Sequence, residues 1–161
     1  MVDILGFNID PKSEGQVSAD DFSEITEWVA GVKFAGEFYD ATADEIKDVV
    51  KLYPIDYVEV EDLDVVEKIG LLGKPLIVRI QLDNEAELGR LKSSLSYLDE
   101  LAHMVIIRSN NADLFDSIDA QIGYYNGNLK LLKGYGITED SSMCKYPGLA
   151  LEATEEERPG Y

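Results

Sequence analysis

The sequence has little cysteine and no long apolar run, and each shortage excludes a class of protein. Its one cysteine, Cys144, excludes an internal disulfide and a cysteine-rich zinc site, which suits a reducing compartment. No apolar run approaches the roughly 20 residues that a membrane-spanning helix needs. The first residues, MVDILGF, show neither the basic segment nor the cleavage site of a secretory signal. We therefore expect a cytoplasmic protein, and the sequence predicts no cofactor and no metal.

Basic residues are also scarce. The chain has 14 lysines and arginines against 32 acidic residues, which gives a formal net charge of −18. Such a charge repels nucleic-acid phosphates and anionic lipid alike. We expect neither nucleic acid nor a membrane among its partners, and we interpret the acidity as a strongly solvated surface.

What the sequence does have is a regular alternation of short apolar runs with longer amphipathic segments. Seven runs predict strands, at residues 3–9, 32–39, 56–61, 75–82, 103–109, 129–134 and 148–152.

Between these runs lie segments with helical spacing and their own start signals. Ser18 with Asp21, and Thr42 with Glu45, are spaced like helix-capping pairs. Apolar side chains then recur at the helical period, which predicts faces that pack into a core. They are Phe22, Ile25 and Val29, then Ile46, Val49, Val50 and Tyr53, then Leu88, Leu91, Leu95 and Leu98.

Strands that alternate with helices predict an α/β protein with a parallel sheet. An open doubly wound sheet and a (β/α)8 barrel both remain possible. The Gly-x-Gly-x-x-Gly fingerprint of a dinucleotide-binding sheet does not occur. A complete barrel needs more than about 200 residues and eight strands. We therefore expect one domain, residues 1–161, that resembles a TIM-type barrel with pieces missing at its ends.

Particular residues suggest a family. The stretch LGFNIDPKSEGQVS resembles the second strand and loop of phosphoribosylanthranilate isomerase, whose usual form is close to L-G-F-x-F-x-x-x-S-P-R-x-V-S. Residues 32–46, VKFAGEFYDATADEI, are similar to the family's third strand and helix start, YGIT at 135–138 stands where the family has G-G-L-T, and Pro159-Gly160 matches its last phosphate loop. The matching residues of the first two stretches are Leu5, Gly6, Phe7, Ser13, Val17, Ser18, Gly36, Phe38, Glu45 and Ile46.

The resemblance implies a (β/α)8 enzyme of tryptophan biosynthesis that isomerises an aldose to a ketose with a general acid and a general base. In this register the family's first strand, with the cysteine that serves as base, and its last helix would lie outside the chain. Cys144 falls in a later helix and cannot replace that base. Arg108 stands where the family has its acidic aspartate, and an arginine keeps its proton at any working pH.

The positions that would hold the anionic substrate also depart from the family. Gly15 stands in place of the binding arginine, and residues 59–62 are Glu-Val-Glu-Asp in place of Gln-Leu-His-Gly. Tyr135 replaces the first glycine of G-G-L-T, where a side chain would crowd a phosphate nest. Thr154 follows Ala153 at the last phosphate loop and precedes Glu155, Glu156 and Glu157.

A different polar set stands at the predicted carboxyl ends of the strands: Glu37, Glu59, Glu61, Arg79 and Arg108. It could form a new site at a barrel mouth, or the arginines could pair with the glutamates inside the sheet. Arg108 is the candidate catalytic residue. His103 lies at a strand's amino end, which favours a structural role. The candidates for contact with a phosphorylated sugar or other small molecule are Lys12, Glu37, Glu61, Arg79, Tyr135, Gly136 and Thr154.

Three hypotheses follow. The leading one is an isomerase-like barrel protein that has lost the chemistry. The second is an active isomerase whose first strand is missing, with Arg108 or a glutamate in a reassigned role. The third is an interaction module, because a barrel without one strand has two open edges that favour a homodimer.

Overall fold

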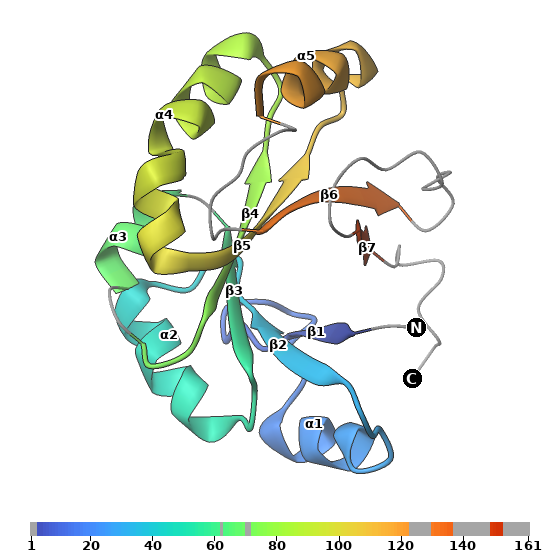
Figure 1. Ribbon diagram of the computed structural model, residues 1–161. Coiled ribbons are helices and arrows are strands. Elements are labelled where there is room, and N and C mark those ends of the chain that lie inside the picture. Colours follow the sequence, from blue (N-terminus) through green and yellow to red (C-terminus); the bar gives the residue numbers. More distant parts are fainter. Residues whose placement is uncertain (1–2, 62, 70–71, 123–129, 137–148, 153–161) are drawn as a thin grey trace. The chain divides into compact units, whose positions relative to one another are not determined.

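The structure, a computed structural model, describes residues 3–61, 63–69, 72–122, 130–136 and 149–152. The chain forms two compact units, Met1–Val78 and Arg79–Tyr161. Helices and strands alternate in both units (Figure 1). The strands are β1 (Ile4–Asn8), β2 (Lys33–Glu37), β3 (Tyr57–Glu61), β4 (Leu76–Gln81), β5 (Ala102–Arg108), β6 (Lys130–Gly136) and β7 (Leu149–Glu152). The helices are α1 (Ala19–Thr26), α2 (Ala43–Val49), the 3-10 turn η1 (Val50–Leu52), α3 (Leu63–Ile69), α4 (Glu85–Leu101) and α5 (Ala112–Ile122).

The sheet follows the chain, with strand order β1-β2-β3-β4-β5-β6-β7. In the first unit β1 pairs in parallel with β2, and β2 with β3. In the second unit β5 pairs in parallel with β6, and β6 with β7. The predicted α/β class and parallel sheet are confirmed, whereas the single domain stays a prediction.

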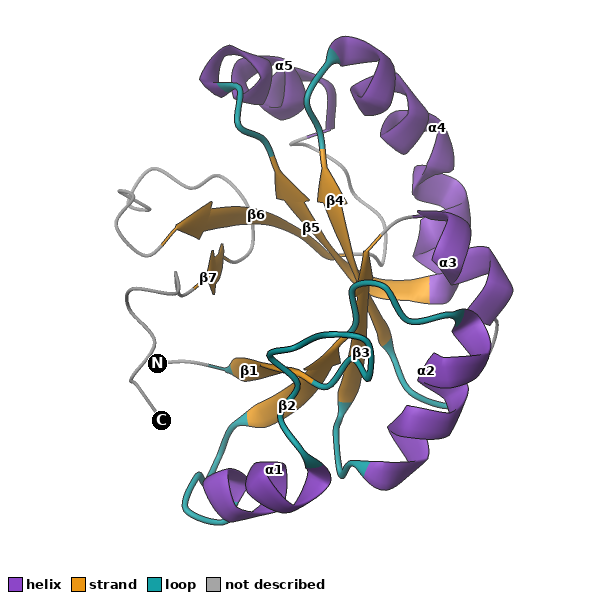
Figure 2. Ribbon diagram, turned by 180° about the vertical axis from the view of Figure 1, so that it is seen from behind, coloured by secondary structure: helices purple, strands orange, loops and turns teal. Residues whose placement is uncertain are grey.

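The core of the first unit lies between its strands and its helices, which Figures 1 and 2 show beside β1, β2 and β3. Phe22 of α1 is fully buried, with ring centroids 5.0 Å from Phe7 of β1, 5.7 Å from Phe34 of β2 and 5.6 Å from Tyr53. All of these pairs meet edge to face, an arrangement that aromatic quadrupoles favour. This aromatic cluster fixes α1 on the sheet.

The capping signals predicted from the sequence are present at both helices. Ser18 caps α1 by accepting a hydrogen bond from the amide of Asp21 at 3.1 Å. Thr42 and Glu45 form a complete capping box at α2, in which each side chain accepts the other residue's amide. The two helices therefore begin where the sequence predicts.

The second unit buries the predicted leucine stripe of α4, whose members Leu88, Leu91, Leu95 and Leu98 are at most 7% exposed. The middle of β5, from Met104 to Ile107, is buried at every position. Burial at every position means that both faces of the strand are covered, which is typical of a parallel sheet flanked by helices. Figure 2 shows α4 and α5 beside β4 and β5.

Several sequence-based boundaries are wrong, and the strand predicted over 32–39 is β2, which ends at Glu37. The stripe that includes Val29 extends too far, because α1 ends at Thr26 and the chain turns at Gly31, whose φ of 78° suits glycine. The strand predicted over 129–134 is β6, which continues through Tyr135 and Gly136 because both pair with β7. Tyr53 lies beyond α2 and η1 but is buried, as the stripe predicts.

Candidate functional site

The loop from β1 to α1 is closed by its own polar groups and by the Tyr53 hydroxyl. The side-chain amide of Asn8 donates to the Ser13 hydroxyl at 2.7 Å, and the backbone amide of Val17 donates to the backbone carbonyl of Asn8 at 2.8 Å. The Tyr53 hydroxyl donates to the Val17 carbonyl at 2.8 Å. At Gly15 a Cβ would lie 3.3 Å from Nδ2 of Asn8, so little room remains beside that residue. The loop is thus ordered by internal bonds.

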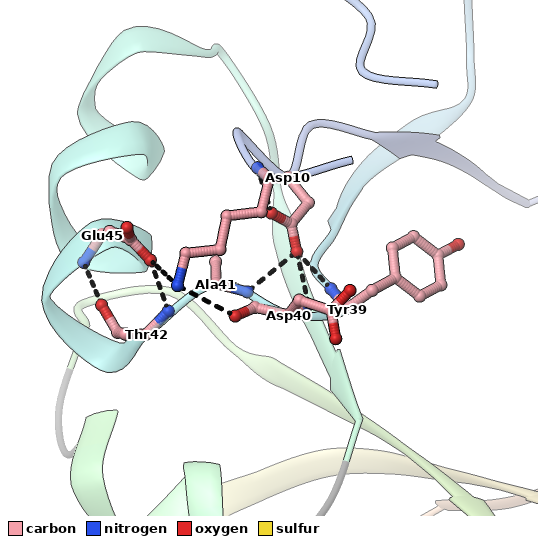
Figure 3. A network of polar contacts seen from close by, with 7 residues as sticks. Asp10, Tyr39, Asp40, Ala41, Thr42 and Glu45 are labelled. Atoms are coloured by element: carbon pink, nitrogen blue, oxygen red, sulfur yellow. Dashed lines mark hydrogen bonds and ion pairs between the residues drawn. The ribbon is translucent and has the colours of Figure 1, made fainter. Parts of the chain in front are cut away.

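Asp10 is the centre of a polar network that joins this loop to the next one, from β2 to α2 (Figure 3). Its side chain is fully buried. Oδ2 accepts the backbone amides of Tyr39 at 2.7 Å, Asp40 at 2.7 Å and Ala41 at 3.0 Å. Oδ1 accepts the amide of Lys12 at 2.8 Å. Four amides therefore satisfy one buried carboxylate.

Burial by itself would raise the pKa of Asp10. The hydrogen bonds from the amides of Lys12, Tyr39, Asp40 and Ala41 outweigh burial and hold the pKa below its ordinary value of 3.8. Asp10 therefore carries its negative charge at neutral pH.

Lys12 reaches from the same loop to α2. Its ammonium lies 3.1 Å from a carboxylate oxygen of Glu45 and 3.4 Å from the carbonyl of Asp40. The Thr42 amide, and next the Lys12 ammonium, lower the pKa of Glu45. Lys12, a predicted ligand contact, is placed in an ion pair with the capping box of α2.

Glu37, the last residue of β2, lies on the face of the sheet opposite the aromatic cluster. The strand register places Asn8, Glu37 and Glu59 side by side, since Asn8 pairs with Glu37 and Glu37 with Glu59. The Tyr39 hydroxyl donates to Glu37 at 2.7 Å. The carboxylate lies over Gly6 of β1, where a Cβ would overlap it. A glycine at this position thus gives Glu37 the space that it occupies.

The three glutamates of β2 and β3, which the sequence singled out, differ in their surroundings. Glu37 is half-buried, Glu59 is 5% exposed in the middle of β3, and Glu61 is exposed at the end of that strand. The structure therefore brings Glu37 and Glu59 into one row. It places Glu61 at the solvent-exposed end of the same strand.

The second unit carries Arg79 and Arg108. Arg79 is 6% exposed within β4, and Arg108 is the half-buried last residue of β5. The Leu82 amide donates to the Arg108 carbonyl at 2.8 Å. Between β1 and β2, the Ile9 amide donates to the Glu37 carbonyl where the preceding residue, Asn8, pairs with Glu37. By the same geometry, the bond from Leu82 to Arg108 places the preceding residue, Gln81, beside Arg108. Side chains alternate along a strand, which places Arg79 and Arg108 on one face.

The other predicted residues lie elsewhere. The backbones of Tyr135 and Gly136 end β6, in register with Leu151 and Glu152 of β7. His103 is the second residue of β5, at the amino end of the strand as predicted. Cys144 and Thr154 lie outside the described residues. Pairing of the arginines with the glutamates stays a prediction.

Within the described ranges, no group of three or more histidine, cysteine, aspartate or glutamate side chains is arranged to hold a metal ion. In that same part of the chain, no helix combines the length and apolar character needed to cross a membrane.

Sequence reasoning missed Asp10. Its local signal is present, because Asp-Pro-Lys-Ser is a turn sequence in which the side chain accepts an amide two residues on, as Asp10 does from Lys12. Its bonds to residues 39–41 depend on the pairing of β1 with β2, which no local pattern contains.

These features define a class of protein in which parallel strands alternate with helices and the loops after the strands carry polar networks. No protein-family model matches the sequence, and no curated protein matches it. Among solved structures, the chain is similar to the phosphoribosylanthranilate isomerase of Thermotoga maritima, with 19% identity and a TM-score of 0.66 over 94% of this chain and 77% of that one.

Two further solved isomerases show the same similarity. The one from Pyrococcus furiosus is 14% identical, with a TM-score of 0.68 over 99% of this chain and 80% of that one. The one from Thermus thermophilus is 15% identical, with a TM-score of 0.64 over 93% and 76%. The chain therefore has the fold of phosphoribosylanthranilate isomerase, as the resemblance predicted.

Proposed function

We propose that this chain keeps the fold of phosphoribosylanthranilate isomerase without catalysing the isomerisation. The observation that carries the proposal is the position of Arg108 as the last residue of β5. In the register of the family this is the position of the general acid. An arginine side chain keeps its proton near neutral pH, so ring opening of the ribose has no acid there.

The row formed by Asn8, Glu37 and Glu59 supports the same proposal. The family's substrate is an anion with a phosphate and a carboxylate, and like charges nearby oppose its binding. Glu37 is fixed over Gly6 by Tyr39, and Glu59 is buried beside it. A face that carries two neighbouring glutamates is a poor site for that anion.

The finer architecture belongs to the same proposal. We infer that β1 corresponds to the family's second strand and that the strands and helices follow the pattern of a TIM-type barrel. The match of LGFNI with the second-strand pattern supports this correspondence. A TIM-type barrel places its chemistry at the carboxyl ends of the strands, where Glu37 and Arg108 lie.

The test is growth of an isomerase-deficient bacterial strain without tryptophan, together with turnover of phosphoribosylanthranilate by the purified chain. We expect no growth and no turnover above the uncatalysed rate, with the Thermotoga maritima enzyme as positive control. Growth or measurable turnover would show that the chain is an active isomerase. Loss of that turnover in Arg108→Ala would then give the arginine a reassigned role.

We also propose a homodimer formed through the sheet edges. In the strand order, β1 and β7 are the terminal strands, and an edge strand offers unpaired backbone groups to another chain. Sedimentation at micromolar concentration should give the mass of a dimer. A monomer mass at every concentration would contradict the proposal.

A further inference from the structure

Three consecutive amides of the loop from β2 to α2 converge on a single oxygen atom. The amides of Tyr39, Asp40 and Ala41 all donate to Oδ2 of Asp10, at 2.7, 2.7 and 3.0 Å (Figure 3). Successive amides that point into one concavity form an anion-binding nest. These residues precede Thr42, the N-cap of α2, so the nest belongs to the loop and not to the helix.

The occupant of this nest is buried and charged. Asp10 is fully buried, and Ala41 beside it is 7% exposed. A buried carboxylate is costly unless hydrogen bonds or an opposite charge stabilise it. Lys12 directs its ammonium to Glu45 and to the Asp40 carbonyl, while its amide donates to Oδ1 of Asp10. Backbone amides therefore stabilise the charge on Asp10.

The nest is held in place by contacts that do not involve the Asp10 carboxylate. On its amino side, the Phe38 amide donates to the Glu59 carbonyl at 2.9 Å. On its carboxyl side, Thr42 and Glu45 form the capping box that starts α2. The nest is therefore fixed at both ends by neighbouring elements.

The loop that supplies Asp10 has its own contacts as well. The Val17 amide donates to the Asn8 carbonyl, and the side chain of Gln16 donates to the Ile9 carbonyl at 3.3 Å. The loop from β1 to α1 can thus keep its shape when the carboxylate of Asp10 is removed.

We propose that residues 39–41 form an anion-binding nest that exists independently of its occupant, and that Asp10 is its built-in ligand. The carboxylate locks the loop after β1 onto the loop after β2 without any external anion. A small carboxylate of the size of formate can take its place when the side chain is shortened. This inference does not depend on whether the chain catalyses an isomerisation.

The experiment is chemical rescue of Asp10→Ala. Thermal unfolding is measured in increasing sodium formate, and in sodium chloride at the same ionic strength. We expect Asp10→Ala to have a lower Tm than the unchanged chain, and formate to raise that Tm saturably and beyond the chloride effect, because a ligand that binds only the folded state stabilises it. An identical response of Asp10→Ala to the two salts would overturn the proposal.

The matched control is Asp40→Ala, which removes a carboxylate from the loop that forms the nest but keeps the Asp10 side chain. Asp40 is exposed, and its amide, rather than its side chain, forms part of the nest. For this variant and for the unchanged chain we expect formate and chloride to act alike. A formate-specific rise of Tm in the control would place the formate site elsewhere and refute the proposal.

A second measurement does not require the variant to fold. Amide hydrogen exchange of the unchanged chain should show residues 39–41 protected to a degree comparable with the amides of β2, since all three donate to a buried acceptor. Exchange of these three amides at the rate of an unstructured chain would refute the nest.

Discussion

At the scale of single residues, the most consequential group is a carboxylate that sequence motifs did not single out. Asp10 couples two loops that are 29 to 31 residues apart in sequence. If the Asp10 carboxylate is removed, the buried amides that donate to it lose their acceptor. The free energy of leaving these amides unsatisfied is larger than the net contribution of the hydrogen bonds to stability. The stability of the folded chain therefore depends in part on this one side chain.

The first prediction concerns the loss of stability at acid pH. The pKa of Asp10 is lower in the folded chain than its ordinary value of 3.8, so the folded state binds this proton less tightly than the unfolded state does. Its contribution to stability is complete above the unfolded pKa and is lost as the pH falls through the folded pKa. The free energy of unfolding should fall more steeply between about pH 5 and about pH 2 in the unchanged chain than in Asp10→Asn.

At neutral pH we expect Asp10→Asn to lower the free energy of unfolding by about 2–4 kcal/mol. The NH2 group of asparagine would replace one accepting oxygen and would face backbone amides that are donors themselves. Urea unfolding across the pH range measures both effects. Parallel pH profiles for the two proteins would contradict the assignment.

The second prediction concerns Gly36 of β2. A Cβ at this position would overlap Cδ1 of Ile9 and lie 2.8 Å from Cδ1 of Ile55, two buried side chains. Gly36→Ala should therefore lower the free energy of unfolding by about 1–3 kcal/mol through overpacking.

Its matched control is Gly89→Ala in α4. No atom lies within 4 Å of a Cβ built there, and alanine is the better helix former. We expect this variant to raise stability by about 0.5–1 kcal/mol in the same urea titration. Equal effects of the two substitutions would contradict the packing described for Gly36.

At the scale of elements, helix starts were predictable and several ends were not. Ser18 and Thr42 are recognisable because their caps involve residues three positions away. The end of α1 before Val29, and the extension of β6 through Gly136, depend on a turn and on pairing with β7. Pairing between distant segments is not encoded in a local period, so these boundaries required the structure.

The third prediction concerns the aromatic cluster that joins α1 to β1 and β2. Phe22 is fully buried and meets Phe7, Phe34 and Tyr53 edge to face. Phe22→Ala should lower the free energy of unfolding by about 3–5 kcal/mol, from lost apolar burial and the cavity left behind.

Trp28, in contrast, follows α1 and is 85% exposed. Trp28→Ala should change the free energy of unfolding by no more than about 0.5 kcal/mol, measured in the same way. A large loss for Trp28→Ala together with a small one for Phe22→Ala would contradict the placement of α1 on the sheet.

At the scale of the whole molecule, the net charge of −18 is the dominant electrostatic property. Surface charges of one sign repel one another in the compact state and are screened beyond about 10 Å at 0.1 M salt. The unfolded chain spreads the same charges further apart, so this repulsion favours unfolding.

The fourth prediction follows from that repulsion. Raising sodium chloride from about 0.05 M to about 0.5 M should raise the Tm, because screening weakens the repulsion more in the folded chain. Calorimetry at fixed pH measures the shift, with a variant in which several exposed acidic residues of α4 are neutralised as control. That control should have a smaller salt response, and a Tm that falls with salt would contradict the argument.

The sequence by itself determined the α/β class, the parallel order of strands and helices, the capped starts of α1 and α2, and the resemblance to phosphoribosylanthranilate isomerase. These properties follow from the local spacing of residues and from residue types that match the family's strand and loop patterns. Only the tertiary structure showed that Asp10 fills a nest in the next loop, that Lys12 pairs with Glu45, and that Glu37 lies over Gly6. Those contacts arise from the register of β1 with β2, which brings together residues about 30 positions apart, and no local pattern specifies that register.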